Sequence, residues 1–283
     1  MQASINYIRK ELEGLYPPEE IEGFIRIIFA SIKQYNLTDL FLKRDEILKQ
    51  NETQFISKII SRLKANEPIQ YIFGETEFYD LPFKLSENVL IPRPETEELV
   101  DWILKSRKNT PTRILDVGTG SGCIPVSLKK NWTNAQVMAC DISEKALKIA
   151  QLNAGINQTE VAFFHLNILN PLLPASFPNI DILVSNPPYV TETEKKLMPK
   201  NVLNFEPKQA LFVPDDNPLL FYKALVDFGK KYLNEKGQIF WEINEAFGKD
   251  CENLLKENGF KNVKLKKDIN GRDRMIFAEY LKS

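Results

Sequence analysis

The sequence is poor in the residues on which many enzymes depend. Its 283 residues include one histidine and three cysteines. His165 ends the apolar run VAFFHL, which favours a structural role over a Ser-His-Asp triad. HExxH metal sites are excluded because they need two histidines. Cys123, Cys140 and Cys251 form no CxxC pair and are odd in number. We therefore expect buried free thiols, no zinc site and no disulfide framework.

The sequence also lacks an excess of charge and a long apolar run. Lys and Arg number 37 against 38 Asp and Glu, for a net charge of −1. Binding to long duplex DNA needs many uncompensated cations, so this balance argues against it. No window reaches the roughly 18 apolar residues of a membrane span, and the first residues, MQASINYIRKELEG, lack the apolar core of a signal peptide. We expect a cytoplasmic protein with no membrane contact.

Residues 1–72 show the apolar spacing of helices and carry no catalytic signature. We predict a small helical bundle, with helices over 17–34, 38–50 and 52–66, that serves as a scaffold or docking module. Residues 73–92 alternate in patches between turn residues and predict a β-hairpin linker.

Residues 93–283 form the predicted catalytic domain, in which strand and helix patterns alternate after a Thr-Pro-Thr linker at 110–112. Such alternation is typical of a mostly parallel sheet with helices on both faces. Asn270-Gly271, between two strand-like runs, indicates that the sheet ends in an antiparallel hairpin. Buried strands are expected at 113–118, 135–141, 161–166, 181–186 and 237–243, and helices near 218–233 and 247–258.

A glycine-rich loop, DVGTGSG at 116–122, follows the first predicted strand. Its three glycines allow a sharp turn and the close approach of a ligand. Asp141 ends the second strand, 19 residues after Gly122, where a carboxylate can accept hydrogen bonds from both ribose hydroxyls. The pattern predicts a nucleoside site. Cys123 replaces a glycine of the dinucleotide fingerprint, which disfavours NAD, and Asp116 suits a cationic ligand such as S-adenosylmethionine.

A second loop, Asn186-Pro187-Pro188-Tyr189, follows the fourth predicted strand and should lie at the same edge of the sheet. Asn186 offers an amide oxygen as acceptor. Pro188 favours an extended Pro187, whose carbonyl is a second acceptor, and Tyr189 offers a flat face for stacking. Together they would hold a planar NH2 group with its nitrogen toward a methyl donor. An isolated NPPY could also be a proline-rich turn.

NPPY, DVGTGSG and Asp141 together resemble the amino-methyltransferase branch of the class I S-adenosylmethionine enzymes. Within that branch the chain is similar, over nearly its whole length, to the peptide chain release factor glutamine N5-methyltransferases, the PrmC/HemK family. The resemblance implies an α/β class I methyltransferase fold, Rossmann-like and mostly parallel with an antiparallel edge hairpin, after a small helical domain. The segments that carry it are EPIQYIFGETEF (67–78), VLIPRPETEELV (89–100), LNFEPKQALF (203–212) and WEI (241–243).

The resemblance implies that S-adenosylmethionine is the methyl donor, with S-adenosylhomocysteine as product, and that the protein substrate is a class 1 release factor, methylated on the glutamine of its GGQ motif. Asn186, Pro187 and Tyr189 are then the expected catalytic residues, and with Pro188 they hold the substrate amide. The residues expected to bind the donor are Gly118, Thr119, Gly120, Ser121, Gly122, Asp141, Asn167, Ile168 and Asn186.

The sequence departs from similar enzymes at Asn167-Ile168, where an Asp, often followed by an aromatic residue, is usual. An Asn oxygen can still accept a hydrogen bond from the adenine amino group, so either residue could flank the adenine.

Three other interpretations stay open. An N-methyltransferase acting on an exocyclic amino group of a flipped nucleic-acid base could use the same NPPY. The near-neutral charge and the lack of a target-recognition insert count against it, so we expect no direct nucleic-acid substrate. A catalytically silent binding module fits the intact loops poorly, and an NAD-dependent dehydrogenase fits Cys123 poorly. Nothing demands more than a monomer.

Overall fold

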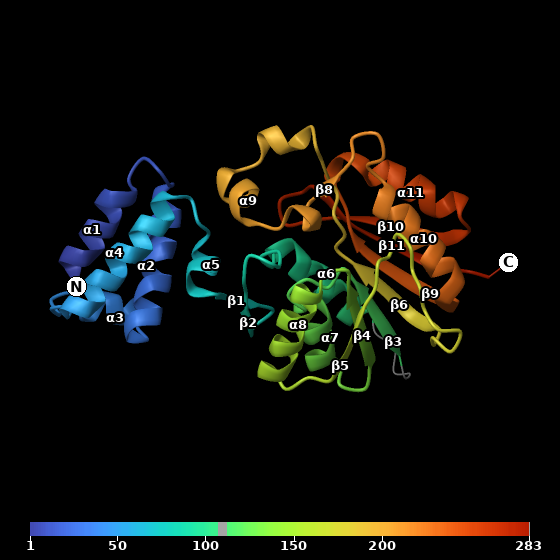
Figure 1. The fold of residues 1–283 in the computed structure, drawn as a ribbon, viewed down its shortest axis with the longest axis horizontal. Helices are drawn as coiled ribbons and strands as arrows, with labels where there is room; N and C mark the ends of the chain where they lie inside the picture. Colours follow the sequence, from blue (N-terminus) through green and yellow to red (C-terminus); the bar gives the residue numbers. More distant parts are fainter. Residues whose placement is uncertain (107–111, 283) are drawn as a thin grey trace. The chain divides into compact units, whose positions relative to one another are not determined.

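The computed structural model describes residues 1–106 and 112–282, so Thr110 and Pro111 of the predicted linker lie outside the described residues. Figure 1 shows the chain as a ribbon. It divides into two compact units. The first comprises residues 1–73 with 200–205, and the second residues 74–199 with the chain from Glu206 onward. In the described part of the chain, no helix is both long and apolar enough to cross a membrane.

The first unit is built from helices packed around an apolar core of their own. Residues on α1, α2 and α4 spaced three and four apart, such as Ile5 and Ile8 or Ile56 and Ile60, fill that core. Its helices are α1 (Gln2–Leu12), α2 (Pro18–Lys33), α3 (Leu37–Leu42), α4 (Gln50–Lys64), α5 (Ile69–Phe73) and α9 (Lys200–Phe205).

The helix predicted over 38–50 is much shorter than expected. A capping box between Asn36 and Asp39 begins α3, but the helix ends at Leu42. Leu42 is 71 % exposed and Ile47 is 90 % exposed, so these apolar side chains of the segment bury little surface. Most helical stability in proteins comes from packing of the apolar face, which explains the early end.

The second unit contains a seven-stranded sheet. Parallel pairing joins β3, β4, β5, β6 and β9, while β11 runs antiparallel to both β9 and β10. The mostly parallel sheet and its antiparallel edge hairpin, β10–β11, are therefore confirmed. In spatial order the strands are β10 (Phe260–Lys267), β11 (Asp273–Tyr280), β9 (Leu233–Glu242), β6 (Ile180–Ser185), β3 (Arg113–Val117), β4 (Gln136–Asp141) and β5 (Val161–His165).

Helices cover both faces of this sheet, as predicted (Figure 1). One face packs on α6 (Pro94–Lys105), α7 (Cys123–Asn131) and α8 (Glu144–Ile156), and the other on α10 (Leu220–Tyr232) and α11 (Gly248–Glu257). Alternate residues of β3 point to opposite layers, since Ile114 joins the first and Leu115 the second. All three cysteines are buried free thiols, as expected.

Short elements complete the second unit. Phe78 and Phe83 of the β1–β2 hairpin pack in the same apolar layer as α6, α7 and α8, and their rings meet edge to face. These elements are β1 (Glu75–Phe78), β2 (Leu81–Lys84), β7 (Val190–Thr191), β8 (Phe212–Val213) and the 3₁₀ turns η1 (Glu194–Leu197), η2 (Lys208–Ala210) and η3 (Glu245–Phe247).

The order of the strands fixes where a ligand can bind. The chain runs from β3 outward to β4 and β5, then returns to place β6 on the other side of β3. Crevices form at the carboxyl ends of the strands where such a reversal occurs. Both predicted loops follow strands at this point, the glycine loop after β3 and NPPY after β6.

Candidate active site

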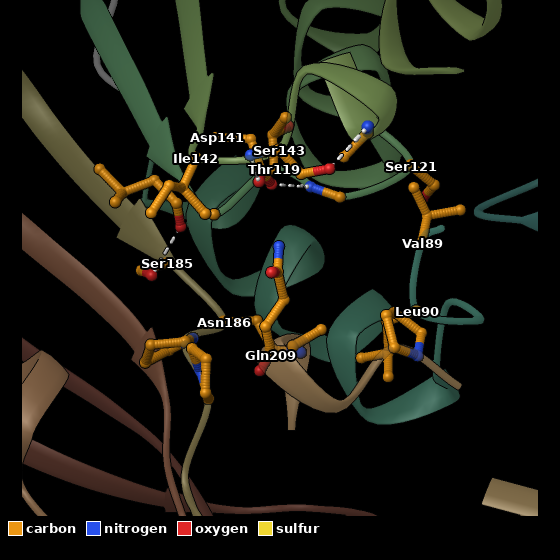
Figure 2. A pocket seen from close by; sticks show the side chains of 18 of the residues that line it. Val89, Leu90, Thr119, Ser121, Asp141, Ile142, Ser143, Ser185, Asn186 and Gln209 are labelled. Carbon is orange, nitrogen blue, oxygen red and sulfur yellow. Dashed lines mark hydrogen bonds between the residues drawn. The ribbon is translucent and has the colours of Figure 1, made fainter. Parts of the chain in front are cut away.

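A cavity of about 250 Å³ lies at this reversal point (Figure 2). The structure brings together there all of the predicted site residues except Gly122 and Tyr189, which are not among the described residues that line it. The predicted residues that do line the cavity are Gly118, Thr119, Gly120, Ser121, Asp141, Asn167, Ile168, Asn186, Pro187 and Pro188.

The glycine loop is held in a tight turn at the start of α7. The backbone amides of Gly118 and Thr119 donate to the Cys140 carbonyl at 2.9 and 3.0 Å, which fastens the loop to β4. Gly122 has φ +80°, and a Cβ there would lie 2.9 Å from the Ala150 Cβ on α8. Gly122 therefore serves the close packing of loop and helix, although it does not line the cavity.

Asp141 lies where a ribose-binding carboxylate was predicted. Its Oδ2 accepts from the Gly120 amide and its Oδ1 from the Ser143 amide, both at 2.9 Å (Figure 2). Burial raises the pKa of Asp141, and the hydrogen bonds from these amides oppose that rise. Each oxygen keeps a lone pair for a further donor, so the carboxylate suits a pair of ribose hydroxyls.

Asp116 is an unpaired acid beside the glycine loop. It is fully buried, and neither carboxylate oxygen makes a hydrogen bond of normal geometry within the described residues, although the Thr119 hydroxyl lies near it. Burial raises its pKa to about 7, an effect that the Thr119 hydroxyl opposes and the charge of Asp141 adds to. A carboxylate without a neighbouring cation favours a positively charged ligand. The charges of the site therefore fit S-adenosylmethionine, which carries a sulfonium and an ammonium group.

Apolar side chains form part of the cavity wall. Asn167 and Ile168 both line it, but the Asn167 Oδ1 already accepts from the Leu169 amide at 3.0 Å. Two further lining residues were missed by the sequence analysis: Ile142, 51 % exposed, and Leu169, 44 % exposed. Ile142 directly follows Asp141, and this place in the sequence could have indicated that Ile142 lies at the binding site. These exposed apolar side chains suit the faces of an adenine ring.

The NPPY loop is anchored by a carboxylate that the sequence analysis missed. The Asn186 Nδ2 donates to the Glu242 Oε2 at 2.8 Å and to the Thr96 Oγ1 at 3.2 Å. This leaves the Asn186 amide oxygen as the group available to a substrate. Glu242, at the end of β9, is 2 % exposed. Its only signal in the sequence was its place in the WEI segment.

Tyr189 has a different position from the stacking plate that was predicted. Its hydroxyl donates to the Glu242 Oε1 at 2.9 Å, and its ring packs against the core beside α10. The charge of Glu242 adds to burial in raising the pKa of this hydroxyl well above its usual range. In the structure Tyr189 therefore supports the carboxylate that holds Asn186.

Several polar residues line the cavity without having been predicted. Two of them, Arg93 and Gln209, lie in the resembling segments at 89–100 and 203–212. The Arg93 Nη2 pairs with the Glu206 Oε1 at 2.5 Å, and the Glu206 side chain is 1 % exposed. Burial raises the pKa of Glu206 although Arg93 opposes it.

Sequence comparisons agree with this geometry. The Methyltransferase small domain family matches residues 96–209, and the PrmC N-terminal domain family matches residues 4–74. A release factor glutamine methyltransferase of Flavobacterium psychrophilum is 48 % identical over 278 residues, which cover 95 % of each chain. The chain belongs to the release factor glutamine methyltransferase family. A family member from Bacteroides thetaiotaomicron is 44 % identical over 274 residues, covering 96 % of this chain and 97 % of that protein.

A solved structure shows the same fold at low sequence identity. A methyltransferase from Pyrococcus furiosus superposes with a TM-score of 0.54 at 16 % identity, over 80 % of this chain and 100 % of that one. The methyltransferase fold and the resemblance to the release factor glutamine methyltransferases are both confirmed.

Proposed function

We propose that this protein transfers a methyl group from S-adenosylmethionine to the side-chain amide nitrogen of the GGQ glutamine in class 1 release factors. The observation that carries the proposal is the NPPY loop. Its Asn186 lines the cavity with the NH2 group bound to Glu242, so an amide oxygen is left to receive a substrate NH2 group. The alternative function, methylation of a nucleic-acid base, is not favoured, because the chain belongs to the release factor glutamine methyltransferase family.

The donor half of the cavity is assigned to residues at the carboxyl ends of β3, β4 and β5. S-adenosylmethionine supplies a methyl group activated by its sulfonium. Asp141 would bind the ribose hydroxyls through the lone pairs that the backbone leaves free. Ile142 and Leu169 line the cavity and would hold the adenine between apolar side chains. Asp116 is fully buried and does not line the cavity, so its carboxylate would stabilise the positive charge of the bound donor through space, without touching it.

On the acceptor side, catalysis rests mainly on positioning. An amide nitrogen is a poor nucleophile because its lone pair is delocalised into the carbonyl. Holding the two reacting groups in line can lower the barrier by about 7–11 kcal/mol. The Asn186 oxygen and the Pro187 carbonyl would accept hydrogen bonds from the substrate NH2 group, and these fixed dipoles would stabilise the positive charge growing on the nitrogen. The proton leaves with or after the transfer, since this side of the cavity offers acceptors rather than a strong base.

We assign the parts of the chain as follows. Residues 1–72 dock the release factor, residues 73–92 form a hairpin linker, and residues 93–283 catalyse the transfer. The match of residues 4–74 to the PrmC N-terminal domain supports a dedicated first module. We propose a cytoplasmic monomer, because a release factor is a translation protein and one chain supplies every residue assigned to the cavity.

Labelled S-adenosylmethionine tests this proposal. The protein is incubated with a release factor and, in parallel, with the same factor carrying alanine in place of the GGQ glutamine. We expect label on the natural factor alone. Label on both factors would refute the assigned site, and label on neither factor would refute the substrate. Label on single-stranded or duplex nucleic acid in its place would promote base methylation.

A further inference from the structure

Glu242 is buried at the point where NPPY, α6 and β9 meet. Three donors converge on its carboxylate: the Thr96 hydroxyl at 2.7 Å and the Asn186 Nδ2 at 2.8 Å on Oε2, and the Tyr189 hydroxyl at 2.9 Å on Oε1. Glu242 does not line the cavity itself, but two of the residues that donate to it, Asn186 and Thr96, do. The Thr96 hydroxyl gives its hydrogen to Glu242 and accepts from Asn186, so Asn186 is the residue through which the carboxylate can act on a substrate NH2 group.

The hydrogen-bonding capacity of this group fixes which end of the Asn186 amide faces Glu242. An ionised carboxylate only accepts hydrogen bonds. The Thr96 hydroxyl spends its single hydrogen on Glu242, so it too can only accept from Asn186. Both neighbours of the Asn186 amide thus require its NH2 group. Turning the amide over would set its oxygen against two acceptors and leave both of them without a donor from Asn186, which strongly disfavours that orientation.

The surroundings of Glu242 keep a negative charge tolerable there. Burial raises the pKa of Glu242, and Thr96, Tyr189 and the Arg274 cation lower it, while Glu95 adds a small rise. Arg274 reaches the Tyr189 hydroxyl at 3.4 Å and pairs with Asp268 at 3.2 Å. Arg274 is partly buried, and a cation near a buried carboxylate reduces the free-energy cost of that negative charge.

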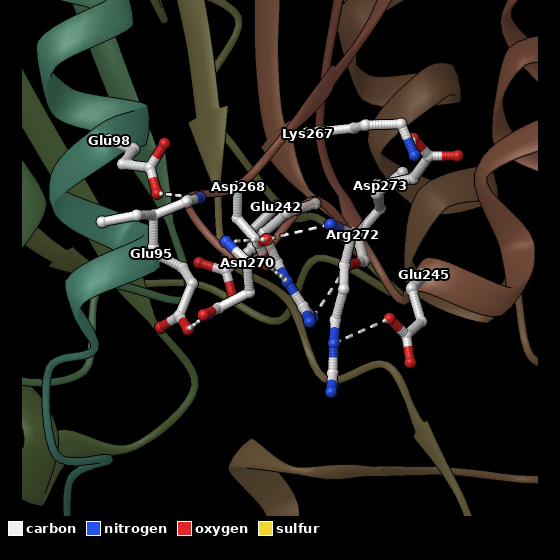
Figure 3. A network of polar contacts seen from close by, with 12 residues as sticks. Glu95, Glu98, Glu242, Glu245, Lys267, Asp268, Asn270, Arg272 and Asp273 are labelled. Atoms are coloured by element: carbon white, nitrogen blue, oxygen red, sulfur yellow. Dashed lines mark hydrogen bonds and ion pairs between the residues drawn. The ribbon is translucent and has the colours of Figure 1, made fainter.

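The turn between β10 and β11 fixes this cation in turn. Asp268 accepts from the backbone amides of Asn270 and Arg272, at 2.9 and 3.0 Å. Glu98 at the start of α6 accepts from the Ile269 amide at 2.9 Å. Figure 3 shows Glu242 among these turn residues, with Glu95 and Glu98 beside them. Glu242 and its supports thus form one polar network that joins α6, β9, the NPPY loop and the β10–β11 hairpin.

We propose that Glu242 is a positioning residue for methyl transfer, which locks the Asn186 amide so that its oxygen faces the substrate NH2 group. The proposal rests on the proposed function. With the amide reversed, the Asn186 NH2 group would face the substrate NH2 group, and two hydrogen-bond donors would oppose each other. The reversed amide would also destabilise the positive charge on the substrate nitrogen. The Glu242 charge also polarises the Asn186 amide, which makes its oxygen a better acceptor.

An exchange of the two side chains tests this role. Asn186→Asp places two carboxylates against each other, and their repulsion breaks the contact until one of them takes up a proton at lower pH. Glu242→Gln lets either end of a neutral amide face Asn186. In the double variant, Asn186→Asp with Glu242→Gln, the NH2 group lies on residue 242 and the carboxylate on residue 186. The same hydrogen bond is restored with its partners exchanged, and an oxygen still faces the substrate.

Single-turnover rates with labelled donor and release factor are measured for all variants. We expect each single variant to lose at least tenfold in rate, and the double variant to exceed Asn186→Asp by at least tenfold. Asn186→Asp alone should regain rate toward acid pH. Donor affinity should change less than threefold throughout. A merely structural Glu242 would give additive losses, which would overturn the proposal.

Two controls separate this role from folding and from the proposed function. Glu279→Gln makes the same chemical change on β11, where the carboxylate accepts from Gln238, and its rate should equal that of the unchanged protein. Melting temperatures identify variants that fold poorly. If the unchanged protein labels the factor and the exchange gives no rescue, positioning by Glu242 is wrong and the proposed function stands. If the unchanged protein labels no release factor, both fall.

Discussion

The side-chain amide of Asn153 ties the glycine loop to the hairpin. Its Nδ2 donates to the Ser121 carbonyl at 2.9 Å and to the Lys84 carbonyl at 2.9 Å, while its Oδ1 accepts from the Lys84 amide at 2.7 Å. Asn153 lies on α8 and is fully buried. One side chain therefore holds the donor loop, α8 and β2 in a fixed relation.

Replacing this side chain should loosen the donor loop. Asn153→Ala leaves three backbone groups without their partner, so we expect a loss of stability of about 1–3 kcal/mol. We also expect at least fivefold weaker binding of S-adenosylhomocysteine by calorimetry. Asn157→Ala is the matched control, because Asn157 holds the Pro82 carbonyl and does not bind the glycine loop. It should lose stability alone, and equal loss of affinity in both would contradict this role of Asn153.

The two ends of the glycine loop should respond differently to an added methyl group. Gly118 and Gly122 have similar φ, +75° and +80°, but a Cβ at Gly118 meets nothing within 4 Å whereas one at Gly122 meets Ala150. Gly122→Ala should therefore be less stable than Gly118→Ala by about 1–3 kcal/mol, the usual cost of overpacking. Urea denaturation without donor measures the difference. Equal stabilities would show that α8 moves aside freely.

Asp116 should make the stability of the ligand-free protein fall with rising pH. Its native pKa of about 7 exceeds the ordinary value of 3.8, so the native state binds more protons than the unfolded state between these values. Unfolding free energy is lost across this window as the buried carboxylate ionises. Asp116→Asn should gain stability relative to the unchanged protein from about pH 4 to pH 7, by a few kcal/mol in all. A difference independent of pH would contradict the raised pKa.

The Arg93–Glu206 pair should be sensitive to the loss of its cation. Arg93→Met leaves the buried Glu206 carboxylate without its cation, and we expect a loss of about 1–3 kcal/mol in urea denaturation. Adding Glu206→Gln removes the unpaired charge and should restore most of that loss. A double variant no more stable than Arg93→Met would show that the charge of Glu206 is not the cause.

Asn186→Ala should separate donor binding from turnover. Removing the amide oxygen takes away one acceptor for the substrate nitrogen, and losses of about 10²–10³ in rate are typical for one such group. Donor affinity by calorimetry should stay within about threefold, because the donor contacts assigned above lie at the ends of β3, β4 and β5, whereas Asn186 follows β6. Undiminished turnover would refute the assigned acceptor role of Asn186.

The parts of the site that could be predicted are those formed by short, continuous stretches of sequence. The glycine loop, Asp141 and NPPY each stand at the end of an apolar strand pattern, and parallel strands bring their ends to one edge. Their places around the cavity follow from that rule. The limits of α3 were not predictable in this way, because they depend on how little of its apolar face is buried.

The role of Glu242 could not be predicted from local sequence patterns. Its partners Thr96 and Asn186 lie 146 and 56 residues away in the chain. A single acid at the end of a strand is indistinguishable in sequence from one that faces solvent. Tyr189 was assigned to the substrate for the same reason, since only the fold shows that its hydroxyl reaches Glu242.

Residues 200–205 fold with the first unit although their neighbours in the chain belong to the second. The chain therefore passes between the units at three places, after residues 73, 199 and 205. No single cut yields two complete modules, because a fragment that begins at Gly74 retains α9 without the unit to which it belongs. A chimera that takes its first module from one relative must take α9 from the same relative, so the two stretches should be inherited as a pair.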